Sequence, residues 1–303
     1  MKTRSLVSLL AIAAASAVAL AGCSSSSSAG SDDGTVRIVA STNVYGDIAE
    51  TIGGDAVSVT SLMSDPAQDP HSFEASAQNQ LAVSKARVVI ENGGGYDDFM
   101  QTLEKGAKNG DATVLNVVDL SGLKPSSGGE LNEHVWYDFP VMQKFVDALT
   151  AALAKAEPAR KSDFEKNADA FRKQLTSLED ATAQLKASYA GAGVAITEPV
   201  PLYLLEAAGL VNKTPEKFSE AIEQESDVSP VVLNETLALF SGHQVKLLAY
   251  NEQTTGTATE RVLDAAKKAG VPVVPVTETL PAGKHYIDWM QGNIDAIGKA
   301  LAK

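Results

Sequence analysis

The sequence predicts an α/β protein with two Rossmann-like lobes, each built on a parallel sheet, bridged by one long rigid α-helix. In both halves of the chain, short apolar runs rich in β-branched residues alternate with segments of helical periodicity, which is typical of βαβ units. Between the halves, residues 159–190 contain neither Pro nor Gly. Beyond residue 34 about 270 residues remain, which is enough for two α/β domains.

The N-terminal lobe is expected to cover residues 35–140. Its strands are short apolar runs that end in glycine or polar turn residues, and its helices lie between them. The expected strands are 36–41, 57–62, 86–93 and 113–118, and the expected helices are 45–52 and 75–84.

A helical segment, residues 141–191, is expected to follow. Apolar residues recur at helical spacing from Val141 to Ala156. Pro158 then opens a second helix that Gly191 ends, since Pro is tolerated in the first turn and Gly commonly follows the last. A helix of about thirty residues spans roughly 45 Å. A coiled coil is the alternative, but the apolar heptad is not sustained, so a strut between two lobes is favoured.

The C-terminal lobe, residues 192–303, repeats the α/β pattern without repeating the sequence. The expected strands are 193–197, 245–250 and 271–276, and the expected helices are 201–209, 231–242, 256–269 and 285–302. Ligands of open α/β sheets bind beyond the carboxyl ends of the strands. Two such lobes joined by a strut are therefore expected to place their strand ends face to face.

The N-terminus has the features of an export signal. Residues 1–22 combine a basic start with an apolar run and small residues before Cys23, which predicts a signal peptide. A transmembrane anchor is the alternative, but the run is short for a span. Leu20–Cys23 matches the bacterial lipobox, so Cys23 is the expected lipidation site. Residues 23–34 are serine-rich and predict a flexible tether.

Charge and cysteine content exclude some classes of function. The formal net charge is −13, and loss of residues 1–22 removes two basic residues and no acidic one, giving about −15. An acidic chain argues against binding to nucleic acid or anionic lipid and is compatible with cation capture. Because Cys23 is the only cysteine, neither an intramolecular disulfide nor a cysteine metal site is possible.

Two histidines and two glutamates follow predicted strands, two in each lobe. His71 comes after strand 57–62, and His134 comes after strand 113–118. Glu198 lies directly at the end of strand 193–197, and Glu278 lies at the end of strand 271–276. Two imidazoles and two carboxylates suit a borderline divalent cation, namely Zn, Mn, Fe or Co.

Each of these residues also has a structural interpretation. His71 could cap the helix that follows it, and His134 could be an interior histidine bonded to backbone. Glu198 could lie near a helix N-terminus, where the helix dipole favours an acid. Glu278 could be a solvated loop residue. These alternatives stay open on the residues alone.

Several segments resemble the metal-binding lipoprotein family, the solute-binding proteins of bacterial ABC importers for manganese and zinc. They are STNVYGDIAETIGGDAVSV, DPHSFEAS, SKARVVIENG, HVWYD, ITEPVPLYLLEAAGL and VTETLPAGKHYIDWMQGNIDAIGKAL, and they span nearly the whole mature chain. The resemblance implies two α/β lobes bridged by one long helix. It also implies four metal ligands, carried over onto His71, His134, Glu198 and Glu278.

The sequence departs from the family pattern around three of these ligands. Asn132-Glu133 precedes His134 where the family often has Asp-Pro, and Glu278 stands where Asp is typical. The third ligand is His in many members and Glu in others; here it is Glu198, which is followed by the unusual continuation Pro199-Val200-Pro201. Glu252, after strand 245–250, is a competing fourth ligand.

Other features bear on the expected site. His243 and His285 are expected to be surface or capping residues outside it. The Asp69-Pro70 turn is expected to hold His71 in place before the metal arrives, because proline fixes φ and reduces the entropy lost on binding. Zinc importers of the family often carry a long His-rich loop before the second ligand, but here the region reads only SSGGELNE.

The expected protein is therefore a monomeric, lipid-anchored binding protein on the outer face of the cytoplasmic membrane. It would capture Mn²⁺, or Zn²⁺ as the second choice, and deliver it to an ABC permease. The harder carboxylate donors and the missing His-rich loop favour manganese. A surface adhesin and a metallohydrolase are the alternatives; hydrolysis would need an open coordination position and a general base, so no enzyme is expected.

Overall fold

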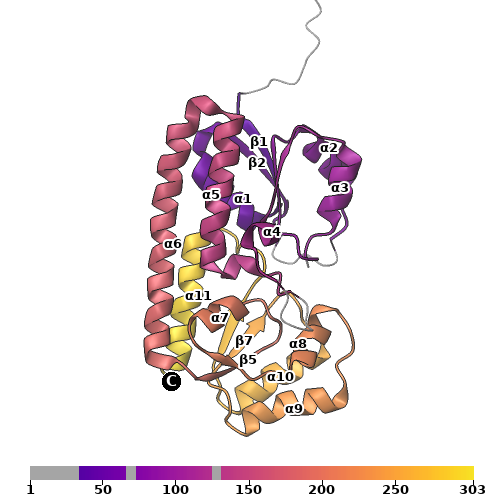
Figure 1. Cartoon of the computed structure of the whole chain (residues 1–303). Helices are drawn as coiled ribbons and strands as arrows, with labels where there is room; N and C mark the ends of the chain where they lie inside the picture. Colours follow the sequence, from indigo (N-terminus) through magenta and orange to yellow (C-terminus); the bar gives the residue numbers. More distant parts are fainter. Residues whose placement is uncertain (1–33, 66–72, 125–130) are drawn as a thin grey trace, which may run out of the picture. The chain divides into compact units, whose positions relative to one another are not determined.

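The computed structural model describes residues 34–65, 73–124 and 131–303, and the fold below belongs to the compact unit Thr35–Lys303 (Figure 1). It contains two four-stranded parallel sheets, which confirms the predicted α/β fold class. Within the described ranges, none of the helices is both long and apolar enough to cross a membrane.

The N-terminal sheet has the strand order β2-β1-β3-β4, with all pairs parallel. Its strands are β1 (Val36–Thr42), β2 (Val57–Met63), β3 (Val88–Glu91) and β4 (Thr113–Asn116), and its helices are α1 (Asn43–Gly53), α2 (Ala77–Lys85), α3 (Phe99–Ala107) and α4 (Val117–Ser121). Helix α1 packs closely on β2, since a Cβ on Gly46 would come within 2.1 Å of the Ser61 hydroxyl. An apolar cluster joins this sheet to α2 and α3.

The helical segment consists of α5 (Phe139–Ala156) and α6 (Lys161–Tyr189). Asp138 caps α5 by accepting from the backbone N–H of Val141. The 29-residue α6 is roughly 43 Å long and contacts α5, α1, α7 and α11. Its buried stripe recurs every three or four residues: Phe164, Ala168, Phe171, Leu175, Leu178 and Thr182. Because α6 packs on helices from both halves, it forms the predicted bridge (Figure 1).

The C-terminal sheet has the order β6-β5-β7-β8, again all parallel. Its strands are β5 (Gly193–Ile196), β6 (Val211–Asn212), β7 (Leu248–Asn251) and β8 (Val273–Val276), and its helices are α7 (Leu202–Ala207), α8 (Glu216–Glu223), α9 (Pro230–Ser241), α10 (Thr257–Lys268) and α11 (Tyr286–Leu301). A second apolar cluster packs α8, α9 and α10 on this sheet. The strand order matches that of the first lobe.

Some predicted elements were wrong or missing. Val117 and Val118 were assigned to strand 113–118 but begin α4, because the Asn116 side chain accepts from the backbone N–H of Asp119 and starts a helix. Helices α3 and α8 and the two-residue β6 were not predicted. In α8, Phe218 and Ile222 are buried four residues apart, a spacing that could have revealed it.

The segment before α11 is tied to the N-terminal lobe. The Asn43 side chain donates to the carbonyl of Leu280 (2.9 Å) and accepts from its N–H (2.8 Å). Asp47 accepts from the backbone N–H of Tyr286 (2.8 Å) and lies 2.6 Å from Nδ1 of His285. These bonds join α1 to the chain that follows β8, so the two lobes are connected near the ends of their sheets.

Candidate metal centre

Three of the four predicted ligands come together beyond the strand ends. His134, Glu198 and Glu278 have exposed fractions of 1%, 3% and 1%. His134 Nε2 lies 3.9 Å from Glu278 Oε2. Two donors about 2.1 Å from one ion are roughly 3–4 Å apart, so this pair has a separation suited to shared coordination. His71 and Cys23 lie outside the described residues.

His134 is held by the side chain of Asn132. Asn132 Oδ1 accepts from the His134 backbone N–H (3.1 Å) and lies 2.7 Å from Nδ1 of its ring. The Asn132 Nδ2 group donates to the carbonyl of Pro199 (3.1 Å), which fixes the orientation of the amide. Because the amide oxygen can only accept, Nδ1 carries a hydrogen, which leaves Nε2, the nitrogen on the side of Glu278, available to a metal.

The two glutamates lie side by side at the end of the C-terminal sheet. Each follows its strand by two residues: Glu198 after β5 and Glu278 after β8. Strand β7 lies between β5 and β8, and its last residue, Asn251, donates to Glu198 Oε2 (2.6 Å) and Glu278 Oε1 (2.8 Å). The sheet order thus gathers two carboxylates that are 80 residues apart in sequence.

The structure bears on the structural interpretations of His134, Glu198 and Glu278. The ring of His134 is buried and bonds to the side-chain amide of Asn132. Glu198 lies three residues before Pro201, the N-cap of α7, so it is near the start of that helix but is not its cap residue. Glu278 is buried and therefore is not a solvated loop acid, whereas the competing Glu252 is exposed. The geometry favours Glu278 over Glu252.

The two excluded histidines lie away from this cluster. His243 is exposed at the end of α9 and has a φ of 50°. His285 is the N-cap residue of α11, with a 76% exposed side chain that pairs with Asp47. The Asp47 carboxylate raises the pKa of His285. Both residues are surface or capping residues, as predicted.

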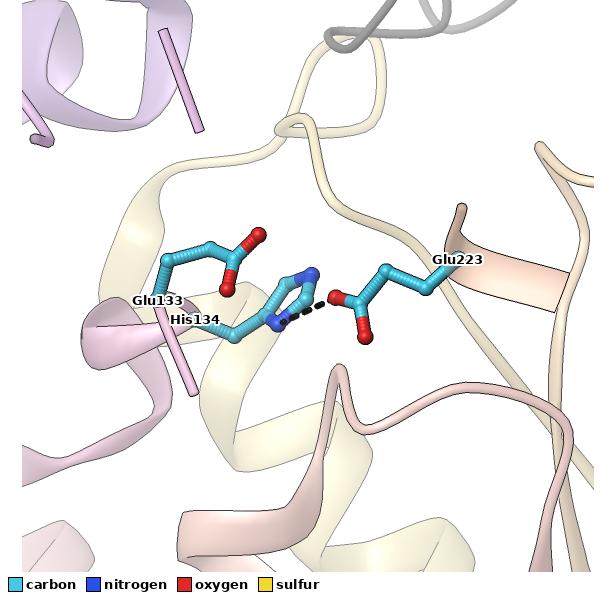
Figure 2. Close-up of side chains that lie close together, drawn as sticks. All are labelled: Glu133, His134 and Glu223. Carbon is cyan, nitrogen blue, oxygen red and sulfur yellow. Dashed lines mark ion pairs between the residues drawn. The ribbon is translucent and has the colours of Figure 1, made fainter. Parts of the chain in front are cut away.

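Sequence reasoning missed two carboxylates that lie on either side of the imidazole. Glu223, at the end of α8, has Oε1 3.7 Å from His134 Nδ1, and Glu133 lies beside the ring (Figure 2). One donor atom from each of these three residues lies within 4.8 Å of the others, a spacing that could hold a metal ion. A cation on Nδ1 would displace the hydrogen that binds Asn132, so Nε2 is the better donor.

Aromatic rings enclose the imidazole. Tyr96 and Trp136 pack on His134 with ring centroids 5.9 and 5.1 Å away. Burial, together with the nearby Glu278 carboxylate, raises the pKa of Tyr96, and burial raises that of Tyr137, whose hydroxyl donates to the carbonyl of Thr277 (2.9 Å). Both phenols therefore stay neutral at physiological pH, and the rings provide a low-dielectric wall in which charged groups interact strongly.

This fold and donor cluster are those of a two-lobed binding protein. The sequence model of one family, described as "Zinc-uptake complex component A periplasmic" (ZnuA), matches residues 38–300. The chain belongs to this family, which confirms the resemblance inferred from its motifs.

Comparisons with individual proteins agree with this placement. The chain is 34% identical over 166 residues to the manganese-binding lipoprotein MntA of Bacillus subtilis, covering 53% of each chain, so it spans about half the length of this relative. It is 25% identical to the manganese ABC transporter substrate-binding lipoprotein ScaA of Streptococcus gordonii, over 94% of this chain and 96% of that one. These relatives are named as binding proteins rather than enzymes, which agrees with the prediction for this chain.

A solved structure shares the fold. The periplasmic zinc-binding protein TroA of Treponema pallidum superposes with a TM-score of 0.76, covering 89% of this chain and all of that one, at 21% sequence identity. At this identity the likeness bears on the fold alone, and it agrees with the two-lobed architecture described above.

Proposed function

We propose that the chain is the extracytoplasmic solute-binding lipoprotein of an ABC importer, which captures a divalent transition metal between its lobes and delivers it to a membrane permease. The observation that carries the proposal is the convergence of buried His134, Glu198 and Glu278 from both halves of the chain. Buried ionisable groups are costly unless they are paired or bind a metal. Family membership and the names of the relatives support the same role.

The proposed ligands are His71, His134, Glu198 and Glu278. We assign residues 35–140 and 192–303 to two metal-binding lobes and residues 141–191 to the helical connection. Two neutral imidazoles and two carboxylates balance the charge of a divalent cation. The cargo is proposed to bind at Nε2 of His134, because its Nδ1 is engaged by Asn132.

A comparison of four variants of the full chain tests this position. Calorimetric titration with Mn²⁺ and Zn²⁺ should show an affinity loss of at least about 10-fold for Glu198→Gln and Glu278→Gln, because each removes a charged donor. Glu133→Gln and Glu223→Gln should change affinity less. If the second pair causes the larger loss, the cation binds on the Nδ1 side and the ligand set is wrong.

Manganese is the proposed cargo, with zinc as the second choice. Carboxylate oxygens are harder donors than imidazole and favour manganese within the limits of the affinity series. A glutamate can also offer its second oxygen, which raises coordination above the four that zinc prefers. Exchanging Glu198 for His should shift relative affinity towards zinc.

Growth of the organism without this protein tests the cargo more directly than affinity does, because zinc binds most such sites more tightly than manganese. The deletion strain should fail to grow when manganese is scarce and recover when manganese is added. Zinc starvation with normal growth in low manganese would overturn the manganese assignment and leave the transport role intact.

Anchoring through Cys23 is the remaining part of the proposal. The protein is proposed to act as a lipid-anchored monomer beside its permease. Cys23→Ser should prevent lipidation and move the protein from the membrane fraction to the soluble one, as followed by cell fractionation and immunoblotting. A variant that stays membrane-bound after a high-salt wash would show that residues 1–22 act as an anchor.

A further inference from the structure

Asn251 lies at the centre of the carboxylate half of the proposed site. It is the last residue of β7, is 1% exposed, and is not itself a predicted ligand. Its backbone N–H donates to the hydroxyl of Thr197, the residue before Glu198 (2.9 Å). The end of β7 therefore places the Asn251 side chain within hydrogen-bond distance of the carboxylates of Glu198 and Glu278.

The amide orientation of Asn251 follows from its bonds. Oδ1 accepts from the backbone N–H of Gln253 (3.1 Å), so Nδ2 faces the carboxylates. Nδ2 lies 2.6 Å from Glu198 Oε2, 2.8 Å from Glu278 Oε1 and 3.2 Å from the Thr254 hydroxyl. Two hydrogens are available for three acceptors, and the carboxylate bonds are shorter and charge-assisted, so each glutamate takes one.

We propose that Asn251 is a positioning residue that sets the spacing of Glu198 and Glu278 and thereby the cation preference of the site. This inference rests on the proposed function. Two buried carboxylates repel each other before a cation arrives, and an amide that bridges them offsets part of that repulsion without adding charge. A cationic side chain in the same place would instead compete with the cargo.

The bridge also affects how each glutamate can coordinate. Glu198 Oε2 and Glu278 Oε1 bind Asn251, whereas Glu278 Oε2 is the oxygen that faces His134. Chelation through both oxygens of either carboxylate would weaken its bond to Asn251. The amide therefore favours one oxygen per glutamate and a low coordination number, which zinc accepts more readily than manganese. Asn251 thus opposes the preference for manganese that the carboxylate oxygens give to the site.

A second residue of the same segment holds the loop of Glu278. Gln253 Oε1 accepts from the backbone N–H of Glu278 (2.5 Å) and of Thr279 (3.2 Å), and its Nε2 donates to the Thr279 hydroxyl (3.1 Å). Asn251 thus bonds to the side chain of Glu278, and Gln253 bonds to its backbone. The side chain of the intervening Glu252 is exposed, and its backbone N–H donates to the carbonyl of Val276 (3.2 Å).

The test replaces Asn251 in the full chain and measures the ratio of affinities for Mn²⁺ and Zn²⁺ by competitive titration. Asn251→Ala should weaken zinc binding by about 10- to 100-fold, the usual cost of losing an outer-shell partner, and manganese binding by less. X-ray absorption of the zinc-loaded variant should show more oxygen neighbours than in the wild type. Asn251→Leu keeps about the same volume and removes both donors without adding a charge, so it repeats the test if the alanine variant does not fold.

Asn109→Ala is the matched control, because Asn109 also makes two bonds through Nδ2, to the carbonyls of Val83 (2.9 Å) and Ala86 (2.8 Å), and lies between α3 and the start of β4. It should leave the affinity ratio unchanged. An unchanged ratio and zinc coordination number in folded Asn251 variants would overturn the inference. Failure of the wild type to bind either cation would instead overturn the proposed function, so the two failures are distinct.

Discussion

The two lobes share one strand order but present their candidate donors differently. In the C-terminal lobe, Glu198 and Glu278 follow β5 and β8 by two residues, and Asn251 of the intervening strand binds both. In the N-terminal lobe, His134 comes long after the end of β4 in the sequence. It is held by Asn132, which bonds to Pro199 of the other lobe. The carboxylate half is organised by its own sheet, whereas the described imidazole depends on a contact between lobes.

The largest effect is expected when the imidazole is removed. His134→Ala should lower the affinity for Mn²⁺ and Zn²⁺ by more than about 100-fold, because the loss of a ligand exceeds the 10- to 100-fold cost of losing an outer-shell partner. Isothermal titration of the full chain measures it. His243→Ala, at an exposed position, is the control and should bind as the wild type does. Equal affinities for the two variants would remove His134 from the site.

The carboxylate half can be tested with two glutamates that lie close together after neighbouring strands. Glu278 is buried beside His134, whereas Glu252 is exposed. Glu278→Gln should reduce metal affinity by at least about 10-fold, and Glu252→Gln should not change it measurably. The same titration measures both variants. A larger loss for Glu252→Gln would restore it as the fourth ligand.

A smaller loss is expected when His134 keeps its ring but loses its support. Asn132→Ala removes the acceptor for Nδ1 and the bond to Pro199, so affinity should fall by about 10-fold, towards the lower end of the range for outer-shell partners. Glu278 and Asn251 keep their own bonds in this variant. If Asn132→Ala matches the wild type, the imidazole does not depend on the contact between lobes, and the two halves of the site do not differ in this respect.

The smallest effect concerns the ion pair of His285 and Asp47, which joins α11 to α1. Asp47 raises the pKa of His285, so the pair stabilises the fold below the unfolded-state pKa of about 6.5 and loses this contribution as pH rises through the higher folded-state pKa. His285→Gln should therefore reduce the free energy of unfolding more at pH 5.5 than at pH 9. The difference should be small, because the imidazole is largely exposed.

Urea denaturation at the two pH values measures this difference. Asp47→Asn removes the partner that raises the pKa, so in that background His285→Gln should show no extra pH dependence. A pH dependence that survives in the Asp47→Asn background would mean that another group, such as Glu50 or Asp288, provides the interaction.

Several features were accessible from the sequence because they depend on neighbouring residues. Alternating apolar runs predicted the two sheets, and the absence of Pro and Gly predicted α6. Glu198 and Glu278 could be selected because each follows a strand and the carboxyl ends of parallel strands share one edge. His134 was selected by the same rule. Asn116 is a local signal as well, because it caps α4 and ends β4 two residues before the predicted end of that strand.

Only the tertiary structure decided which side chains meet. Asn251 reaches both glutamates because β7 lies between β5 and β8, an order that the positions along the chain do not specify. Glu223 approaches His134 because α8 of one lobe packs towards a loop of the other. The same holds for the bond between Asn132 and Pro199. Strand order and lobe contact arise from long-range packing of apolar surfaces, which local periodicity does not encode, so the donors could be predicted while the residues that hold them could not.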